Sequence, residues 1–285
     1  MKNLVGNLRS TGFDGGWLVP EPSLVWAIAC LVVLGLAVWF ARREDLDHRT
    51  MYWAGAYGLL GAFLGGALLR GLVEPLTVIQ DPERLLGLIT GSKGVFGAFM
   101  GAALFGRLYL LYRRQPVLAY ADAAVPAVAL GYAVARIGCF LNGDDFGTVT
   151  PVPWAVQFPQ GTEAFAAHVA RGWVTAQDNL SQPVHPTQLY HAAAGLVLFL
   201  VLRQWHGQWQ GSRVALAMVG YGVLRFCIEW FRGDAPSVLG PLHAAHLFGL
   251  AFVAGGIALW WVRGRAGHLS PQSALVTVPL LYIEE

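Results

Sequence analysis

One arginine of this chain lies where the surrounding residue types point most directly to chemistry. Arg136 follows an uncharged run, residues 123–135, that is typical of a membrane helix. The bilayer core does not solvate a guanidinium, so such a residue needs an anionic partner or a water-filled cavity and marks a functional site. Asn142, Asp144, Asp145 and Gly147 follow in a polar, turn-forming stretch. A cation beside carboxylates at a membrane boundary predicts a site for charged lipid head groups.

Two further polar sets begin or interrupt apolar segments. The sequence HPTQLYH supplies His185, Gln188, Tyr190 and His191 at the start of one segment. The second set recurs at intervals of four, four and three residues, which places its members on one helical face: Tyr221, Arg225, Glu229 and Arg232.

Each set also has a purely structural explanation. Arg136 would be an anchor at the membrane surface, the His185 set a helix start with proline at its first position, and the Arg225 set an internally neutralised ladder. Three such sets together favour a common site. Two arginines can hold a phosphodiester through paired hydrogen bonds, carboxylates can orient them, and histidines can accept a proton near neutral pH. The sequence therefore predicts phospholipid head-group chemistry.

The composition is that of an integral membrane protein. Of 285 residues, 55% are hydrophobic and only 13% charged, whereas soluble domains carry roughly 25% charged residues. A net charge of +2 is too small to indicate a nucleic-acid partner. The three cysteines lie in apolar segments and offer neither a disulfide framework nor a metal site.

These apolar runs predict an all-α fold, a single integral membrane domain over residues 1–285 with about seven spans. The expected spans are Leu24–Ala41, Tyr52–Leu72, Val95–Tyr112, Ala119–Ala135, Pro186–Leu202, Val214–Phe231 and His243–Val262. In the second and third, glycines at small-xxx-small spacing predict close helix packing or, alternatively, room for an acyl chain.

Arginines fix the expected orientation. They follow the first, third, fifth and seventh spans, so the positive-inside rule places these ends in the cytoplasm, with the N-terminus outside and the C-terminus inside. The long segment 142–184 is then an outer-face loop, and its tryptophans and phenylalanines predict an ordered cap on the membrane surface. A short interfacial helix is expected within Pro75–Gly94.

At these residues the chain resembles the bacterial prolipoprotein diacylglyceryl transferases, whose signature is similar to G-R-x-G-N-F-x-N-x-E-x-x-G. Here the matching stretch is A-R-I-G-C-F-L-N-G-D-D-F-G, from Ala135 to Gly147. The motifs PW…FP, HPTQLY and Y-x-x-x-R-x-x-x-E-x-x-R follow in the order of that family.

The resemblance implies an inner-membrane transferase. Its members move the diacylglyceryl group of phosphatidylglycerol to the thiol of the lipobox cysteine in a prolipoprotein signal peptide, releasing glycerol phosphate without a metal or other cofactor. Its implied catalytic residues are Arg136, Arg225, Asp144, Glu229, His246 and His185. Its implied substrate-binding residues are Asn142, Gly147, Tyr221, Gln188, Tyr190 and Arg232.

In this assignment Arg136 and Arg225 hold the lipid phosphate and stabilise the leaving group. Asn142 and Asp144 position the head group, and Tyr221 and Glu229 orient Arg225. A base must also generate the thiolate, since a free cysteine is mostly protonated at neutral pH.

The chain departs from the family pattern at several positions. Cys139 replaces the signature asparagine, Asp144 replaces a glutamate, and Phe96 stands where the family has a histidine before a glycine pair. The family tyrosine of the first span has no counterpart in Ser23–Ala27, and Ala245 and His246 replace a Gly-Gln pair. His246, His185 or His191 could supply the base.

Two alternatives stay open on these grounds. A divergent paralogue would transfer a phospholipid-derived group to a different acceptor. A non-catalytic protein would bind or transport membrane lipid, although the chain has no internal repeat of the kind many transporters have.

Overall fold

The computed structural model describes residues 22–73, 95–207, 209–235 and 237–268. Its long helices are α2 (Pro22–Arg43), α3 (His48–Val73), α5 (Val95–Tyr112), α6 (Val117–Asn142), α8 (Thr187–Gln204), α9 (Ser212–Glu229) and α10 (Ala244–His268). A short helix, α7 (Glu163–Ala170), and two short strands, β1 (Ser237–Leu239) and β2 (Leu242–His243), complete the described elements. The expected Pro75–Gly94 helix lies outside the described residues.

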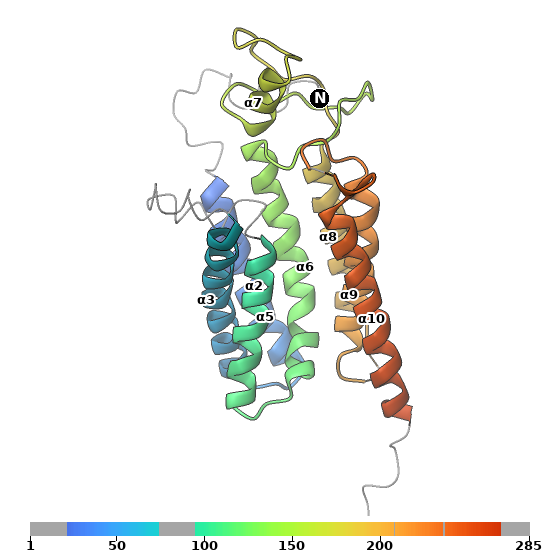
Figure 1. The fold of residues 1–285 in the computed structure, drawn as a ribbon. Coiled ribbons are helices and arrows are strands. Elements are labelled where there is room, and N and C mark those ends of the chain that lie inside the picture. Colours follow the sequence, from blue (N-terminus) through green and yellow to red (C-terminus); the bar gives the residue numbers. More distant parts are fainter. Residues whose placement is uncertain (1–21, 74–94, 208, 236, 269–285) are drawn as a thin grey trace, which may run out of the picture.

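The long helices run side by side in two groups (Figure 1). In one group α3 packs on α5 and α2 packs on α6 and α3; in the other α9 packs on α8 and α10. Helix α6 joins the groups through contacts with α8 and α9. Because α6 is the most buried long helix, as Tyr120, Ala123 and Ala127 illustrate, polar groups near its end can be enclosed by the second group.

The glycines of α3 and α5 bring these two backbones into direct contact. A Cβ at Gly101 would lie 2.7 Å from the carbonyl carbon of Gly61, and one at Gly97 would lie 2.8 Å from that of Gly65. No side chain fits at such distances, so these glycines serve close helix packing, as small-xxx-small spacing allows. Of the two interpretations of this stripe, close packing is therefore confirmed at these positions.

Helix α6 continues seven residues past the Ala135 end expected from the sequence. It ends at Asn142, where Gly143 takes a left-handed conformation (φ 73°) and its N–H donates to the carbonyls of Cys139 and Phe140. The expected span ended with the apolar run at Ala135, and the polar, turn-forming stretch from Asn142 was expected at the helix end, as the structure confirms. Arg136 thus lies inside the helix, nearly two turns from its end.

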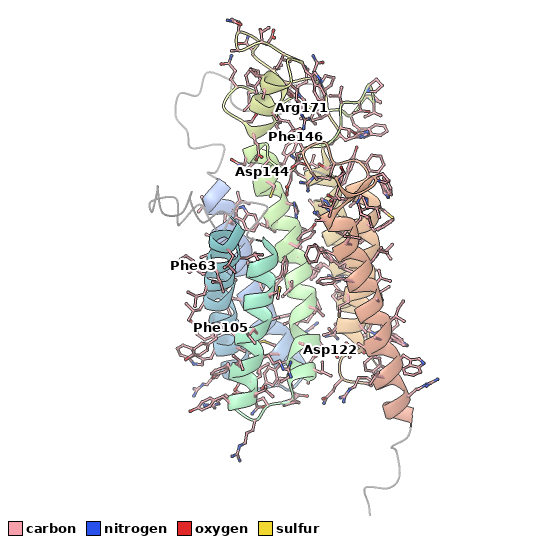
Figure 2. All side chains as sticks on the ribbon, viewed as in Figure 1. Phe63, Phe105, Asp122, Asp144, Phe146 and Arg171 are labelled. Atoms are coloured by element: carbon pink, nitrogen blue, oxygen red, sulfur yellow. The ribbon has the colours of Figure 1, made fainter. Side chains whose placement is uncertain are left out.

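Residues 143–186 fold over one end of the bundle (Figures 1 and 2). Val184 pairs with both Val149 and Val156, and Phe146 and Phe158 pack with it in a buried apolar cluster. Thr162 caps α7 by accepting from the N–H of Phe165. The segment is therefore an ordered cap, and it holds the polar end of α6 against the start of α8.

The opposite end of the bundle is tied by Asp122 of α6 (Figure 2). Its carboxylate accepts hydrogen bonds from the N–H groups of Gly211 (2.6 Å) and Val214 (2.8 Å), and so caps the start of α9 from another helix. Arg213 adds a donation to the Asp122 carbonyl and an ion pair with Glu44.

The all-helical expectation for the membrane part is confirmed in outline. Four described helices, α2, α3, α6 and α10, are long and apolar enough to cross a membrane, and a shorter apolar helix covers Gly97–Tyr112. Helices α8 and α9 have 18 residues each. Helix α9 ends at Glu229, so Arg232 lies past its end and not on its face; the expectation that Arg232 shares that face was wrong.

Candidate functional site

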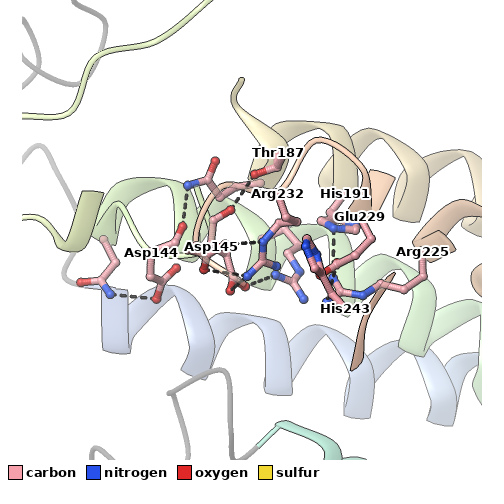
Figure 3. Close-up of polar contacts among 12 residues, drawn as sticks. Asp144, Asp145, Thr187, His191, Arg225, Glu229, Arg232 and His243 are labelled. Atoms are coloured by element: carbon pink, nitrogen blue, oxygen red, sulfur yellow. Dashed lines mark hydrogen bonds and ion pairs between the residues drawn. The ribbon is translucent and has the colours of Figure 1, made fainter. Parts of the chain in front are cut away.

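A buried ion triad joins the end of α6 to the end of α9. The carboxylate of Asp145 accepts from Arg136 through one oxygen and from Arg232, at 2.7 Å, through the other (Figure 3). All three residues are less than a tenth exposed. Arg136 comes from α6, Asp145 from the turn after it and Arg232 from the turn after α9. The triad therefore fixes two guanidinium groups at one end of the bundle.

Asp145 remains ionised in this setting. Burial by itself would raise the pKa of its carboxyl, but Arg232 and Arg136 outweigh that effect and hold the pKa well below its ordinary value. Arg232 is further paired with Asp234, at 2.7 Å. Asp145 is thus a permanent anion that holds two arginines in place.

Arg225 is the third arginine of the site. Its guanidinium lies 3.1 Å from Glu229 Oε2, one turn further along α9, and 3.0 Å from His191 Nε2 of α8. An arginine has no acceptor, so it donates to His191 and the neutral ring carries its proton on Nδ1. Arg225 thus contacts both a buried carboxylate and a buried imidazole.

Glu229 also faces His243, the residue before α10. Its Oε1 lies 3.4 Å from His243 Nδ1. The backbone N–H of His243 donates to Nδ1 of His246 at 3.0 Å, which is the back-donation of a capping box at the start of α10. His246 is fully buried between the rings of Phe226 and Trp230. Its place is therefore that of a positioning residue for the turn that carries His243.

The turn after α6 supplies a second carboxyl, Asp144. Asn142 donates to it at 2.9 Å, and the fully buried Gln188 donates to its backbone carbonyl. Burial, followed by the neighbouring Asp145, raises the pKa of the Asp144 carboxyl to about 7. Thr187 donates to the Asp145 carbonyl at 2.6 Å. The start of α8 thus holds the backbone of both aspartates.

His185 and Tyr190 form a separate cluster under the cap. Trp154 donates to the Tyr190 hydroxyl at 2.8 Å, and that hydroxyl lies 3.0 Å from His185 Nδ1. The Tyr190 hydroxyl therefore bridges Trp154 and His185. Burial lowers the pKa of His185. Among the described residues, no hydrogen bond or ion pair links this cluster to the arginines.

Two further expected residues have mainly packing contacts. Gly147 donates to the His185 carbonyl at 3.0 Å, and a Cβ there would lie 2.8 Å from the Phe231 carbonyl oxygen, so only glycine fits this approach. Tyr221 makes edge-to-face ring contacts with Tyr132 and Phe252. Tyr132 in turn lies under the Arg136 guanidinium, 4.9 Å from it, a favourable cation–π contact.

Several buried polar atoms of the site have no hydrogen-bond partner within the described protein. They are Asp144 Oδ1, Gln188 Oε1, Arg225 Nε, Glu229 Oε2, His243 Nδ1 and His246 Nε2. Buried polar groups are otherwise nearly always paired, at a cost of about 1–3 kcal/mol when they are not. Glu229 Oε2 and His243 Nδ1 still lie in ion pairs, whereas Arg225 Nε has no partner among the described residues and indicates a place for a polar ligand.

Comparison with known proteins identifies the family. Residues 21–262 match the family model described as prolipoprotein diacylglyceryl transferase. The chain belongs to the prolipoprotein diacylglyceryl transferase family. It is 31% identical over 248 residues to the phosphatidylglycerol–prolipoprotein diacylglyceryl transferase of Pseudoalteromonas translucida, covering 82% of this chain and 86% of that protein. It is 34% identical to the enzyme of the same name from Nitrosomonas europaea, covering 83% and 80% respectively.

Within this family member, the replaced signature residue Cys139 lies at the site. Its sulfur and carboxylate oxygens of Asp144 and Asp145 are within 4.8 Å of one another, a set that could in principle hold a metal ion. Asp145 already accepts from two arginines, whose charges oppose a cation there. The set is therefore better suited to holding arginines than to holding a metal. The side chain of Phe96 is outside the described part of the structure.

Four residues of the site were not among the expected catalytic and binding residues: Asp145, Thr187, His191 and His243. His191 was expected only as one of three candidate bases. Asp145 follows Asp144, which matches the signature glutamate, and the sequence gives no sign of which carboxyl turns inward. His243 stands three residues before His246, and that spacing at a helix start was the available signal.

Proposed function

We propose that this chain transfers the diacylglyceryl group of phosphatidylglycerol to the thiol of a lipobox cysteine in prolipoproteins. The observation that carries the proposal is the buried group of Arg136, Arg225 and Arg232 at one end of a helix bundle whose sequence matches the family from residue 21 to 262. Relatives named for this reaction support the substrates.

The chemistry asks for three things of the protein. The thiol must lose its proton, sulfur must attack the glyceryl carbon as its C–O bond to phosphate breaks, and the departing glycerol phosphate must be stabilised. Arg136 and Arg225 take the last role, because guanidinium groups donate two parallel hydrogen bonds to phosphate oxygens. Arg225 keeps an unpaired Nε for this purpose.

Two of the carboxylates, those of Glu229 and Asp145, hold the arginines rather than the lipid. Glu229 orients Arg225, and Asp145 holds Arg136 and Arg232. Asn142 and Asp144 lie next to one another at the edge of the group and take the glycerol hydroxyls of the head group. A half-protonated Asp144 near pH 7 can both donate and accept toward such hydroxyls.

The membrane arrangement follows from the charge pattern. We propose seven spans in one membrane domain of the bacterial inner membrane, with the cap of residues 142–184 on the periplasmic face, the N-terminus outside and the C-terminus in the cytoplasm. The arginine group then lies at the depth of outer-leaflet phosphates.

The competing function is transfer of a phospholipid-derived group to a different acceptor. Cys139 and Phe96 favour it because both replace family residues.

Complementation tests the proposal. In a bacterium depleted of its own diacylglyceryl transferase, the native chain should restore lipoprotein modification, whereas Arg136→Ala and Arg225→Ala should not. His206→Gln, in the exposed turn after α8, is the matched control. If mass spectrometry of the membranes finds a modified molecule that is not a lipoprotein, and no modified lipoprotein, the result would support the competing function.

A further inference from the structure

We propose that His243 is the general base of this transferase and that the Glu229 carboxylate positions its ring. The assignment rests on the proposed function. Sulfur attacks carbon effectively only as a thiolate, so a proton acceptor must stand beside the acceptor thiol. The partly exposed imidazole of His243 lies at ion-pair distance from a buried carboxylate that also contacts Arg225.

The geometry of Glu229 is that of a carboxylate serving two partners. Its side chain is only 2% exposed, with Oε2 3.1 Å from Arg225 and Oε1 3.4 Å from His243 Nδ1 (Figure 3). A carboxylate facing Nδ1 keeps the proton on that nitrogen and leaves Nε2 as the acceptor. It also stabilises the imidazolium that forms when Nε2 takes up a proton.

The other nitrogen of His243 is accessible. The side chain is 16% exposed. Its Nδ1 is fully buried and makes no hydrogen bond within the described protein. Its Nε2 also has no hydrogen-bond partner there, but it is not fully buried. Nε2 is therefore the ring nitrogen that a substrate thiol can reach.

The backbone of His243 is held on both sides. It pairs with Ser237 across the β1–β2 hairpin, and its N–H donates to His246 Nδ1. A base must be positioned before its protonation state matters. His246 is therefore a positioning residue, and its burial against Phe226 and Trp230 explains why this ring does not itself face a substrate.

The competing histidines are each committed elsewhere. His191 Nε2 accepts from Arg225. His185 Nδ1 is hydrogen-bonded to the Tyr190 hydroxyl at 3.0 Å. His168 lies in the cap, where its Nδ1 accepts from the N–H of Gln182.

In the proposed step His243 Nε2 takes the thiol proton while the C–S bond forms. The bond between the glyceryl carbon and the phosphate oxygen breaks at the same time. The electron pair of that C–O bond leaves with glycerol phosphate, beside Arg225 and Arg136. The imidazolium then returns its proton to the phosphate monoester or to water. The charged groups facing His243 are Glu229 and, behind it, Arg225 from α9, with His246 from α10.

The test compares a thiol with an acceptor that needs no base. Native protein and His243→Gln, in phosphatidylglycerol vesicles, are given lipobox peptides carrying either cysteine or selenocysteine, whose selenol is already ionised at neutral pH. General-base catalysis contributes about 10²–10⁴-fold, so His243→Gln should lose rate by this order with cysteine and far less with selenocysteine. Glu229→Gln should lose rate with cysteine as well, and His206→Gln should match the native protein.

The outcomes separate the two proposals. If the native protein modifies the cysteine peptide and His243→Gln does so at the same rate, the assignment of His243 is overturned. The same holds if His243→Gln loses rate equally with the cysteine and selenocysteine peptides. In both cases the proposed function stands. A misfolded variant gives the equal loss too, and an unchanged melting temperature excludes that explanation. A native protein that modifies neither peptide overturns the proposed function, and the role of His243 with it.

Discussion

Glu229 and Arg225 lie one helical turn apart on α9, with a carboxylate oxygen 3.1 Å from the guanidinium and both side chains buried. Breaking a buried pair by removing one partner is costly, because the other charge is left uncompensated. The same carboxylate faces His243, so this pair connects the phosphate side of the site to its proposed base.

Arg225→Lys should lower the transfer rate by about 10²–10³-fold, the usual effect of removing one donor to a developing negative charge. Lysine keeps the charge, but it cannot donate to His191 and a phosphate oxygen from one planar group. Initial rates with a lipobox peptide in phosphatidylglycerol vesicles measure the effect. Arg203→Lys, in the last turn of α8, is the control. A native rate for Arg225→Lys would show that Arg225 does not stabilise the leaving phosphate.

Asp145→Asn should lower the free energy of unfolding by about 3–5 kcal/mol, because it leaves Arg136 and Arg232 buried without their shared anion. Asp45→Asn is a matched control, since both aspartates have a φ of 54° but Asp45 is exposed. Thermal unfolding in detergent makes the comparison. Equal melting temperatures for the two variants would show that Asp145 does not stabilise the fold.

Asp144 predicts a pH dependence of stability with a definite sign. Its folded-state pKa of about 7 exceeds the unfolded value of about 3.9. Between these values the folded chain binds the extra proton, so this group's contribution to stability falls as pH rises from about 4 to about 7 and then levels off. Asp144→Asn should lack this slope. Parallel pH profiles of the melting temperature for native protein and variant would contradict the prediction.

Gly101→Leu should separate α3 from α5. A side chain at this position meets the Gly61 backbone, and overpacking of this kind costs about 1–3 kcal/mol or more. Gly35→Leu on α2 is the control, because no atom lies within 4 Å of a Cβ built there. Yield of folded protein and melting temperature report the difference. A Gly101→Leu variant as stable as Gly35→Leu would mean that the two helices do not pack through these glycines.

The sequence alone predicted the helices better than their ends. Apolar length is set by bilayer thickness, so the long helices could be located from composition. The apolar span ended at Ala135, seven residues before the end of α6, which the turn-forming residues after Asn142 mark and the left-handed Gly143 closes. Likewise Arg232 had the spacing to share a face with Arg225, but α9 ends at Glu229 and the chain turns.

The arginines of the site could be predicted because a buried charge in an apolar segment is rare. The pairing of Arg225 with Glu229, four residues further on, was also predicted and is confirmed, but the contacts that join separate parts of the chain could not be predicted. Asp145 lies 87 residues from Arg232, and the approach of His243 to Glu229 depends on the β1–β2 hairpin. Which of two adjacent aspartates is paired, and which histidine meets a carboxylate, is decided by tertiary folding.

The most direct test of the central claim is the stoichiometry of the reaction in vesicles containing the purified native protein, phosphatidylglycerol and a lipobox peptide. Mass spectrometry should find one diacylglyceryl group added to the cysteine for each glycerol phosphate released, with neither product formed by Arg136→Ala or Arg225→Ala. Glycerol phosphate release without peptide modification, or peptide modification that persists in both arginine variants, would contradict the account.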